Sequence, residues 1–477
     1  MKDDELRFGT SGLRGLSRLL NGRPAAAYAQ AFAHVMIAQG RAERGRRFLV
    51  GRDLRTSSPG IARFCFAGLL EAGVEPVDCG ELPTPALAAR AMKLGVPAIM
   101  VTGSHIPADR NGLKFYRPDG EIDKHDEAAI ADAERAAELL ENVAPANAES
   151  DHGVAVDEYR ARAIGTLAPD ALKGMRIGIY QHSSVTRDLL VDVLSALGAD
   201  VVPFGRSDVF VPIDTEALSA TDAAICGTAV REHRLDAVVS ADADGDRPMI
   251  GNETGRLLRG DVIGALTASD MGAGSVVTPV TSNTGIERSG RFARVIRTRV
   301  GSPYVIEGMD IASAGGASTV VGFEANGGVL LGSDVFLAGR RIAALPTRDA
   351  MLPILAVLNM SKRAGAKISE VEAALKFNAS KSGCIKDADF HMSAAFIREM
   401  AADGLFVSDM FRDVIEVSMI NTTDGLQIIG KDGCIVHFRI SGNAAELRCY
   451  TEANSDDRAS FLLDEGLARA RKYLGMT

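Results

Sequence analysis

Residues 237–247 read AVVSADADGDR, an apolar run that passes directly into a loop with three aspartates. A short apolar run of this kind predicts a buried β-strand. In open α/β sheets, ligands bind beyond the carboxyl ends of the strands, and this loop stands at such an end. The side chains of Asp242, Asp244 and Asp246 occupy alternate positions, so they can converge on one hard cation. We therefore interpret the loop as a cation site, the alternative being a solvated acidic turn.

Two cations come into question for this loop. Its aspartates match the start of a calcium-binding EF-hand, with Glu253 at the twelfth position. An EF-hand needs glycine at the sixth position, where this chain has Arg247, and it follows a helix and not a strand. The sequence thus favours magnesium, with a further ligand from a substrate or a phosphoryl group.

Outward from this loop, three stretches of the chain alternate strand-like runs with helix-like segments, which is typical of α/β units with largely parallel sheets. Helices are expected from Pro59, over 85–94 and over 186–197. Strands are expected over 48–50, 98–101, 175–180, 201–202, 237–239, 275–279, 294–298 and 319–322.

The C-terminal part has a different pattern. Short apolar runs separated by turn residues predict an antiparallel sheet in a smaller α+β domain, with strands over 414–420, 425–429, 434–440 and 447–451. A last helix is expected over 456–474. The 477 residues suggest three or four domains at about 100–200 residues each. We predict three similar α/β domains with mixed, largely parallel sheets and a C-terminal α+β domain, with the division 1–147, 148–260, 261–377 and 378–477.

The composition excludes several classes of partner. The formal net charge is −9 and tryptophan is absent, so we expect neither nucleic-acid nor membrane binding. An anionic substrate must then be held by locally concentrated positive charge. The first residues, MKDDELRFG, do not resemble a secretory signal, and no apolar run approaches the roughly 20 residues that span a bilayer. Six cysteines without a CxxC pair favour a reducing compartment, so a cytoplasmic protein is expected.

A second motif, TGSHIP over residues 102–107, follows the predicted strand 98–101. A hydroxyl on a glycine-containing loop after a strand is a natural position for a nucleophile, here Ser104. His105 would position or polarise the reacting group, and Lys114 would serve as acid or base if burial lowered its pKa. By itself the motif is weak, because a Thr-Gly-Ser loop is more often an ordinary turn.

Three further motifs combine glycine with polar side chains. In GFEANGG (322–328), Glu324 and Asn326 suit a pair of sugar hydroxyls, although an ordinary glycine turn is an equal alternative. RISGN (439–443), followed by Arg448, suits a phosphate, the alternative being an edge strand with exposed arginines. FGTSGLRG (8–15) is either a flexible tail or, as its apolar residues indicate, a docked segment.

Together and in this order, the five motifs resemble those of the α-D-phosphohexomutase superfamily, most closely its phosphomannomutase/phosphoglucomutase branch. The resemblance extends from Phe8 to Arg448. It implies four domains around a central cleft, each of which contributes one loop.

The resemblance also implies a role for each motif. Ser104 would be the phosphorylated nucleophile, and Asp242, Asp244 and Asp246 would hold Mg²⁺ together with an oxygen of phospho-Ser104. The other residues implied are, at the reacting centre, His105, Lys114, Arg14 and Arg247; at the sugar, Glu324 and Asn326; at the substrate's phosphate, Arg439, Ser441, Gly442, Asn443 and Arg448.

The chain departs from the family pattern in three places. The common serine loop TASHNP has Gly103 and Ile106 here, which leaves the nucleophile and its histidine in place. The common phosphate loop SGTEP has Asn443 followed by two alanines. A substrate-contact stretch is present over 299–303 in a variant form, with Arg299 as its candidate residue.

The implied activity is interconversion of hexose 6-phosphate and hexose 1-phosphate through a phosphoserine and a hexose 1,6-bisphosphate, which also serves as activator. Mannose is the first choice of sugar, glucose the alternative and glucosamine the third. Rival classes are a magnesium-dependent sugar phosphatase with an aspartyl nucleophile in the DxD pattern of 242–244, and a non-enzymatic sugar-phosphate-binding protein. The sequence leaves open the oligomeric state and the choice between Lys114 and His105 as general acid/base.

Overall fold

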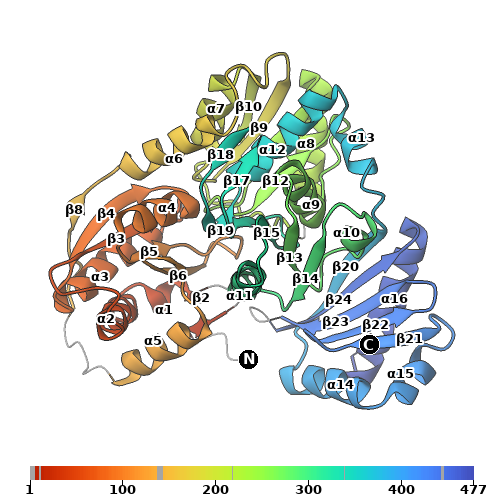
Figure 1. Cartoon of the computed structure of the whole chain (residues 1–477). Helices are drawn as coiled ribbons and strands as arrows, with labels where there is room; N and C mark the ends of the chain where they lie inside the picture. The colour runs from red at the N-terminus through yellow and green to blue at the C-terminus, as the bar shows by residue number, and fades with distance from the viewer. Residues whose placement is uncertain are drawn as a thin grey trace.

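The computed structural model describes residues 6–9, 12–136, 143–216, 219–337, 339–441 and 445–476. In this part of the chain the strands form four larger sheets and one two-stranded hairpin. Figure 1 shows the first sheet in orange at the left, the second at the top, the third in the middle and the fourth in blue at the lower right.

The first sheet carries the N-terminal motif and the serine loop. Its strand order is β1-β2-β6-β5-β3-β4-β8, with β7 beside β6; β3, β4, β5 and β8 are parallel, and β5, β6, β2 and β1 are paired antiparallel in turn. The strands are β1 (Arg7–Phe8), β2 (Leu13–Leu16), β3 (Arg47–Arg52), β4 (Glu75–Glu81), β5 (Ala98–Val101), β6 (Arg110–Arg117), β7 (Gly120–Glu121) and β8 (Glu149–Ser150). The helices are α1 (Ser17–Leu20), α2 (Arg23–Ala38), α3 (Ser58–Glu71), α4 (Thr84–Leu94) and α5 (Lys124–Ala136).

The second sheet has the order β10-β9-β11-β12, in which only β12 is antiparallel to its neighbour. Strand β11 is buried along its whole length, and the loop 242–247 joins it to β12. The strands are β9 (Arg176–His182), β10 (Asp200–Arg206), β11 (Ala237–Ala241) and β12 (Pro248–Gly251). The helices of this part are α6 (Val154–Gly165), α7 (Arg187–Ala196) and α8 (Ala220–His233).

The third sheet has the order β14-β13-β15-β16-β19, parallel over its first three strands and antiparallel over the last two. Its strands are β13 (Ser275–Pro279), β14 (Arg294–Thr298), β15 (Val320–Phe323), β16 (Val329–Leu331) and β19 (Leu345–Asp349). The separate hairpin is β17 (Val335–Leu337) with β18 (Arg340–Ile342). The helices are α9 (Gly260–Asp270), α10 (Gly285–Arg288), α11 (Ser302–Ala314), α12 (Met351–Ala364) and α13 (Ile368–Ala373).

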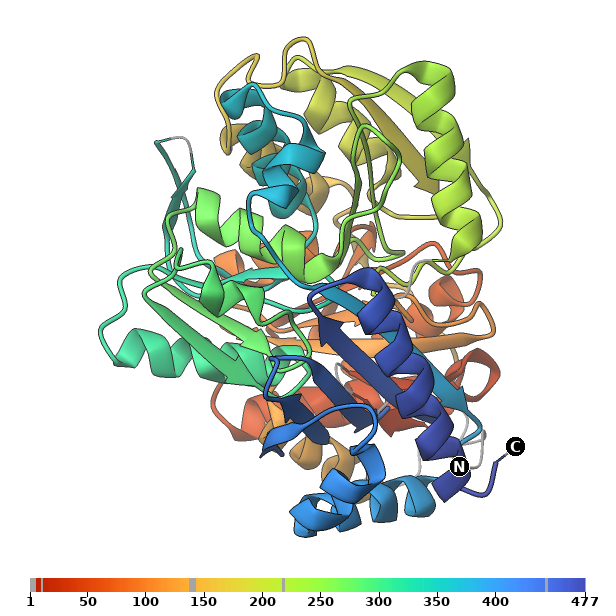
Figure 2. The same cartoon turned by 90° about the vertical axis from the view of Figure 1, so that its right-hand side faces the viewer.

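The fourth sheet is antiparallel throughout, in the order β20-β24-β23-β22-β21. Helix α16 packs on β20 and β24, in front of the sheet in Figure 2. The strands are β20 (Ala379–Lys386), β21 (Val417–Asn421), β22 (Leu426–Gly430), β23 (Ile435–Ile440) and β24 (Glu446–Ala453). The helices are α14 (Phe390–Ala402), α15 (Gly404–Phe411) and α16 (Asp456–Tyr473).

The predicted fold class is confirmed: three α/β parts with mixed sheets precede an α+β part with an antiparallel sheet. No apolar pattern predicted β20, because half of its residues, ASKSGCIK, are polar and most are only partly buried. The sequence analysis also missed α14, α15 and the hairpin of β17 and β18. The strand predicted over 414–420 is β21, which begins at Val417 because Val414 and Ile415 are buried ahead of it.

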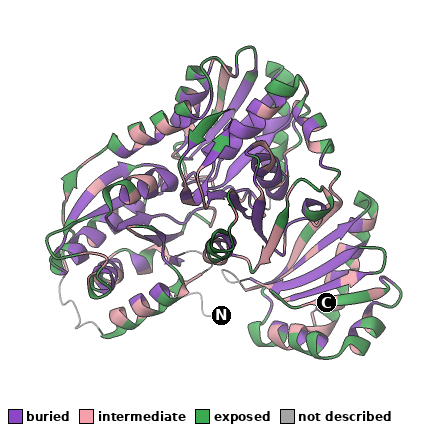
Figure 3. Ribbon diagram, in the orientation of Figure 1, coloured by how far each residue is buried: buried purple, intermediate pink, exposed green. Residues whose placement is uncertain are grey.

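The apolar cores do not follow the four sheets one by one. One continuous core joins the second and third sheets and reaches part of the first sheet, whereas the fourth sheet has a core of its own. Figure 3 shows the buried strands of the fourth sheet set apart from the rest. The predicted division of the chain at residues 147, 260 and 377 therefore remains a prediction.

In the fourth sheet, Phe438 of β23 packs against Phe396 of α14, with ring centroids 5.1 Å apart. Successive residues of a strand point to opposite faces, so His437 and Arg439 lie on the other face. That face is turned toward the third sheet, because Gln427 of β22 donates from Nε2 to the carbonyl of Val280 at 3.1 Å. No helix among the described residues is long and apolar enough to cross a membrane.

Candidate active site

The serine loop begins where β5 ends. Ser104 is buried, and its φ of +52° lies in the left-handed region that residues other than glycine seldom adopt. Its backbone N–H donates to Oγ1 of Thr102 at 2.8 Å, and that hydroxyl donates to Oδ2 of Asp53 at 2.7 Å. Such strain persists only where the surroundings enforce it, and it concentrates at functional sites.

The residue that enforces this conformation is Arg55, which the sequence analysis missed. Its side chain is 1% exposed, and its Nε pairs with Asp53 at 3.2 Å. Its terminal nitrogens donate to four carbonyls of the loop at 2.6–2.9 Å, those of Ser104, Ile106, Pro107 and Arg110. The signal was present in the sequence, because Asp53 and Arg55 directly follow β3, as the other motifs follow their strands.

The serine loop and the aspartate loop meet in the interior. Oγ of Ser104 donates to Oδ2 of Asp242 at 2.5 Å, although 138 residues separate them in sequence. Nζ of Lys114, from β6, lies 2.6 Å from Oδ2 of Asp244 and 2.5 Å from Oδ2 of Asp246. All five side chains are at most 5% exposed. The structure thus brings the predicted nucleophile, the three carboxylates and the predicted acid/base into one cluster.

The carboxylates are suited to a divalent cation. Each offers an oxygen, and these oxygens lie within 4.8 Å of one another. Oδ1 of Asp244 and Oδ1 of Asp246 are buried without a hydrogen-bond partner among the described residues. Since buried carboxylate oxygens are normally satisfied, such unpaired atoms fit a ligand, and oxygen ligands are those that Mg²⁺ prefers. Asp244 is also fixed by Thr84, whose Oγ1 donates to Oδ2 at 2.5 Å.

The crowding of charge shifts several pKa values. Burial, with Asp244 and Asp246 nearby, raises the pKa of Asp242 well above its usual range. Burial also acts to raise the pKa of Asp246, but Arg348, Lys114 and Arg247 outweigh it and lower the pKa.

The pKa of Lys114 moves opposite to the direction expected from burial alone. Burial lowers the pKa, but the carboxylates of Asp244 and Asp246 outweigh it, so the net pKa is raised. The amine is therefore held as a cation in this arrangement. The direction of this pKa shift could not be predicted from the sequence, because the two carboxylates lie 130 and 132 residues away from Lys114.

His105 lies beside Arg247. Nη1 of Arg247 lies 2.8 Å from Nδ1 of His105, and a guanidinium can only donate, so Nδ1 accepts. Burial, together with Arg247 and Arg14, lowers the pKa of His105 well below its usual value, so the ring is neutral. The more distant Arg448 of β24 acts in the same direction, which brings the fourth sheet within electrostatic range of the serine loop.

Arg14, on β2, presents an unsatisfied guanidinium to the same interior. Both of its terminal nitrogens are buried without a hydrogen-bond partner among the described residues. Burial, with Arg247 and Arg348 nearby, lowers the pKa of Arg14 to about 10, so it is still charged near neutral pH. A buried, unpaired guanidinium among other cations suits an anion with several oxygens, such as a phosphoryl group.

The predicted sugar-binding side chains follow β15. Glu324 and Asn326 are 3% and 5% exposed. Oδ1 of Asn326 accepts from the N–H of Gly328 at 3.0 Å, which fixes the turn. Oε2 of Glu324 accepts from Nη1 of Arg348 at 2.7 Å, a contact that no sequence motif indicated.

The predicted phosphate-binding residues stand at the end of β23 and the start of β24. Arg439 and Arg448 face each other in the register of these strands. Nε of Arg439 donates to Oδ2 of Asp424 at 2.8 Å, and the same oxygen accepts the N–H of Val300 at 2.9 Å. The third sheet thus reaches the phosphate-binding segment next to Arg299.

Of the remaining predicted residues, the structure describes some and not others. Ser441 is buried beside Arg439. Arg299 is exposed, with its guanidinium 5.2 Å from the ring of Tyr304. Gly442 and Asn443 lie outside the described residues.

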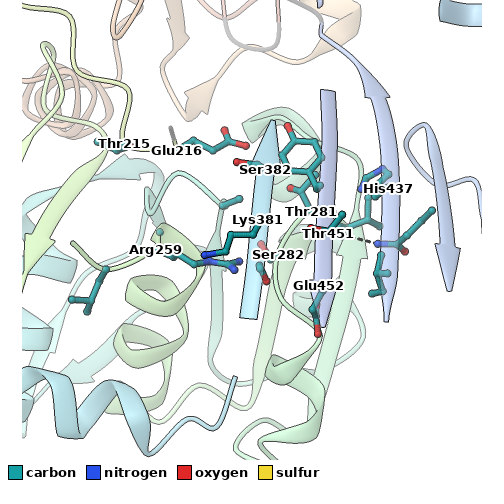
Figure 4. Close-up of a pocket in the computed structure, with 18 of the residues that line it drawn as sticks. Thr215, Glu216, Arg259, Thr281, Ser282, Lys381, Ser382, His437, Thr451 and Glu452 are labelled. Carbon is teal, nitrogen blue, oxygen red and sulfur yellow. Dashed lines mark hydrogen bonds between the residues drawn. The ribbon is translucent and has the colours of Figure 1, made fainter. Parts of the chain in front are cut away.

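A cavity of about 220 Å³ adjoins the sugar-binding turn at Ala325. Figure 4 shows its labelled side chains, which come from the loop before α8, from the loops around α9 and β13, and from the fourth sheet. They include the hydroxyls of Thr215, Thr281, Ser282, Ser382 and Thr451 and the charges of Glu216, Arg259, Lys381 and Glu452. The fourth sheet therefore borders a water-accessible space next to the turn that carries Glu324 and Asn326.

Comparisons with known proteins agree with this architecture. Family models described as phosphoglucomutase/phosphomannomutase, alpha/beta/alpha domain I and domain III, match residues 5–140 and 259–376. A phosphomannomutase of Sinorhizobium fredii is 48% identical over 97% of this chain and 98% of its own length. One of Salmonella muenchen is 42% identical over 98% and 96%. A phosphoglucosamine mutase of Paracoccus denitrificans is 33% identical over 68% and 74%.

Solved structures share the fold. A phosphoglucomutase/phosphomannomutase family protein of Burkholderia thailandensis has a TM-score of 0.76 at 20% identity, over 98% of this chain and 97% of its own. An N-acetylphosphoglucosamine mutase of Aspergillus fumigatus, in complex with GlcNAc-6P and magnesium, has a TM-score of 0.59 at 15% identity, over 98% and 96%.

Behind the aspartate loop lies a buried histidine, His182, at the end of β9. Its Nε2 lies 2.9 Å from the carbonyl of Ala241, so it donates, and Nδ1 has no partner among the described residues. Burial lowers the pKa of His182 from 6.5 to about 4. Because the unfolded chain binds this proton below pH 6.5 and the folded chain does not, His182 makes folding less favourable as pH falls toward 4.

His182 has a φ of +26°, a backbone conformation that asparagine tolerates. We therefore predict that His182→Asn makes the unfolding free energy less sensitive to acid. Between pH 7 and pH 5 the unmodified protein should lose about 2 kcal/mol more unfolding free energy than His182→Asn. Urea unfolding followed by far-UV circular dichroism at both pH values measures this difference. Equal losses in the two proteins would contradict the buried, neutral state.

Proposed function

Since the chain belongs to the phosphoglucomutase/phosphomannomutase family, within the α-D-phosphohexomutase superfamily, we propose that it is a phosphomannomutase, which interconverts mannose 6-phosphate and mannose 1-phosphate. The observation that carries the chemistry is the 2.5 Å contact between Oγ of Ser104 and a carboxylate of a buried aspartate trio. The choice of mannose rests on the two phosphomannomutases that are 48% and 42% identical over nearly the whole chain.

In the proposed reaction, phospho-Ser104 donates its phosphoryl group to the free hydroxyl of the sugar phosphate. The P–O bond at Ser104 breaks as a P–O bond to the sugar forms, and the hydroxyl proton passes to a base. The hexose 1,6-bisphosphate then turns over, and its other phosphate returns to Ser104. The same bisphosphate, supplied from outside, would restore a dephosphorylated enzyme and so act as an activator.

Charge stabilisation and positioning account for most catalysis of phosphoryl transfer. Mg²⁺, held by Asp242, Asp244 and Asp246, would supply a positive charge beside the transferred group. Arg14 and Arg247 would add fixed positive charge, and the terminal nitrogens of Arg14, which have no hydrogen-bond partner among the described residues, would bind phosphoryl oxygens. The hydrogen bonds of Arg55 to the serine loop would hold Ser104 in place beside the carboxylates during the reaction.

We propose Lys114 as the general acid and base, with His105 as the second candidate. The ammonium of Lys114 can return a proton to a departing oxygen and, once neutral, accept one from the attacking hydroxyl. The Nδ1 of His105 already accepts from Arg247, which leaves only the other ring nitrogen for such a role.

Sugar and distal phosphate would be held by separate groups. Glu324 and Asn326 would bind sugar hydroxyls next to the cavity at Ala325. The distal phosphate would be bound by the basic and polar residues of the last domain and its neighbour, namely Arg439, Ser441, Gly442, Asn443, Arg448 and Arg299. Binding of the non-reacting phosphate serves both orientations of the bisphosphate.

We further propose domains at 1–147, 148–260, 261–377 and 378–477. We also propose a cytoplasmic location, which the six unpaired cysteines support.

The sugar preference is tested by a coupled mutase assay on mannose 1-phosphate and glucose 1-phosphate, with bisphosphate activator and Mg²⁺. We expect turnover of both, with the higher kcat/KM for mannose 1-phosphate. A higher value for glucose 1-phosphate would make phosphoglucomutase the activity. Release of inorganic phosphate at the rate of substrate loss would make the protein a phosphatase.

Replacing Ser104 with alanine removes the proposed phosphoryl acceptor. We expect kcat/KM to fall by about 10⁴-fold or more, because the covalent route is lost. Incubation with bisphosphate should add one phosphoryl mass to the unmodified protein and none to Ser104→Ala, by intact-mass spectrometry. The exposed Ser313→Ala is the matched control and should retain both properties. Turnover that survives in Ser104→Ala would remove this serine from the mechanism.

Replacing Asp244 with asparagine removes one anionic ligand from the proposed magnesium site. We expect the Mg²⁺ concentration for half-maximal activity to rise about tenfold or more, together with a lower kcat. Asp123→Asn, in the more exposed group of Asp123, His125 and Asp126, is the control. An unchanged Mg²⁺ response in Asp244→Asn, or a shift only in Asp123→Asn, would place the cation elsewhere.

A further inference from the structure

Arg348 links the aspartate loop to the sugar-binding turn. It lies on β19, and its side chain is 3% exposed. Nε and Nη2 lie 3.1 and 2.8 Å from Oδ2 of Asp246, and Nη1 lies 2.7 Å from Oε2 of Glu324. One planar guanidinium thus binds both a proposed metal ligand and a proposed sugar ligand.

The fold makes room for this arginine. A Cβ at Gly328 would lie 2.6 Å from Cδ of Arg348, closer than real Cβ contacts allow. The glycine after the sugar-binding turn therefore lets the arginine stem cross the backbone. Strand β16 follows this glycine and pairs antiparallel with β19. The register of this pair places Arg348 close to the sugar-binding turn. Figure 1 shows β19 in the middle of the molecule, beside the first sheet.

The contacts leave one face of Asp246 for a ligand. Its Oδ2 accepts from Arg348 and from Lys114, whereas its Oδ1 has no hydrogen-bond partner among the described residues. Arg348 therefore restricts the rotation of this carboxylate and leaves Oδ1, 3.7 Å from Nε of Arg247, available to a ligand. The same guanidinium holds Glu324, so a movement of either carboxylate strains a contact to the other.

We propose that Arg348 is a positioning residue that couples metal binding at Asp246 to sugar binding at Glu324. The proposal rests on the proposed function, because it takes the two ligands from there. The planar fork of an arginine spans two carboxylates at fixed angles, whereas a lysine is a point charge that cannot hold both orientations.

Coupling of this kind is reciprocal. If bound Mg²⁺ raises the affinity for the sugar phosphate, then bound sugar phosphate raises the affinity for Mg²⁺ by the same factor. The coupling factor is the ratio of the Mg²⁺ dissociation constants measured without and with sugar phosphate. A residue that only supported the fold would change both constants or the melting temperature and leave this ratio unaltered.

The test measures that ratio by isothermal titration calorimetry of the full chain, with MgCl₂ as titrant. Titrations are run alone and with a saturating, pre-equilibrated mixture of mannose 1-phosphate and mannose 6-phosphate. The variants are Arg348→Lys, which keeps the charge, and Arg348→Met, which keeps the stem. Arg363→Met, at an exposed arginine that pairs with Asp270 on α12 and α9, is the control. Melting temperatures establish that each variant is folded.

We expect a coupling factor of about fivefold or more in the unmodified protein and in Arg363→Met, and a factor near one in Arg348→Lys. If Arg348→Met folds, its coupling factor should equal that of Arg348→Lys. If Arg348→Met does not fold, the coupling factor of Arg348→Lys alone tests the proposal. A factor that is unchanged in Arg348→Lys, or a factor of one in the unmodified protein, overturns the proposal. Failure of the proposed function has a different signature, the absence of mutase turnover in the unmodified protein.

Discussion

Three carboxylates buried at the end of β11 impose a condition on the structure around them. Anionic groups taken out of water need compensating charge, and here it comes from Lys114, Arg247 and Arg348, on strands and loops of three different sheets. The relative placement of these sheets is therefore tied to the electrostatics of one small volume. Within the part of the chain that the structure describes, oxygens of Asp244 and Asp246 and the guanidinium of Arg14 lack hydrogen-bond partners, so the described groups do not complete this balance. A cation and a phosphoryl group, with opposite charges, would complete it together.

Around that volume, the polar motifs share one local design. The serine loop, the aspartate loop and the sugar-binding turn each follow the end of a buried strand, where the backbone leaves the sheet and side chains can turn toward a common edge. The strands provide rigidity, and short turns provide the required conformations, as in the positive φ of Ser104 and Gly245. Strained or charged loops of this kind persist because the strands on which they stand are deeply buried.

This shared design explains how much the sequence could predict. Residues 98–107 and 237–247 combine a strand signal with unusual polar residues, so strand, loop and chemistry could be inferred together. Arg348 could not, since it lies inside a strand and not in a loop that follows one, and its partners depend on the antiparallel return of β19 to β16. The position of Arg55 after a strand could have marked it as a candidate site residue. Its contacts to four carbonyls could not be predicted, because they depend on the tertiary path of the serine loop. The direction of the Lys114 pKa shift likewise depended on charges remote in sequence.

The separate core of the fourth sheet has a mechanical consequence. No apolar cluster of the described residues spans the junction at Asn378, and Glu452 is joined to Thr284 and Arg288 of the third part by polar contacts, so a movement of the fourth sheet would carry it as one unit. Arg439 and Arg448 would travel with it, whereas Ser104 and the aspartates sit in the larger body. Such a movement would change the width of the cavity at Ala325, whose lining comes from both sides of the junction, while the charged centre stays packed.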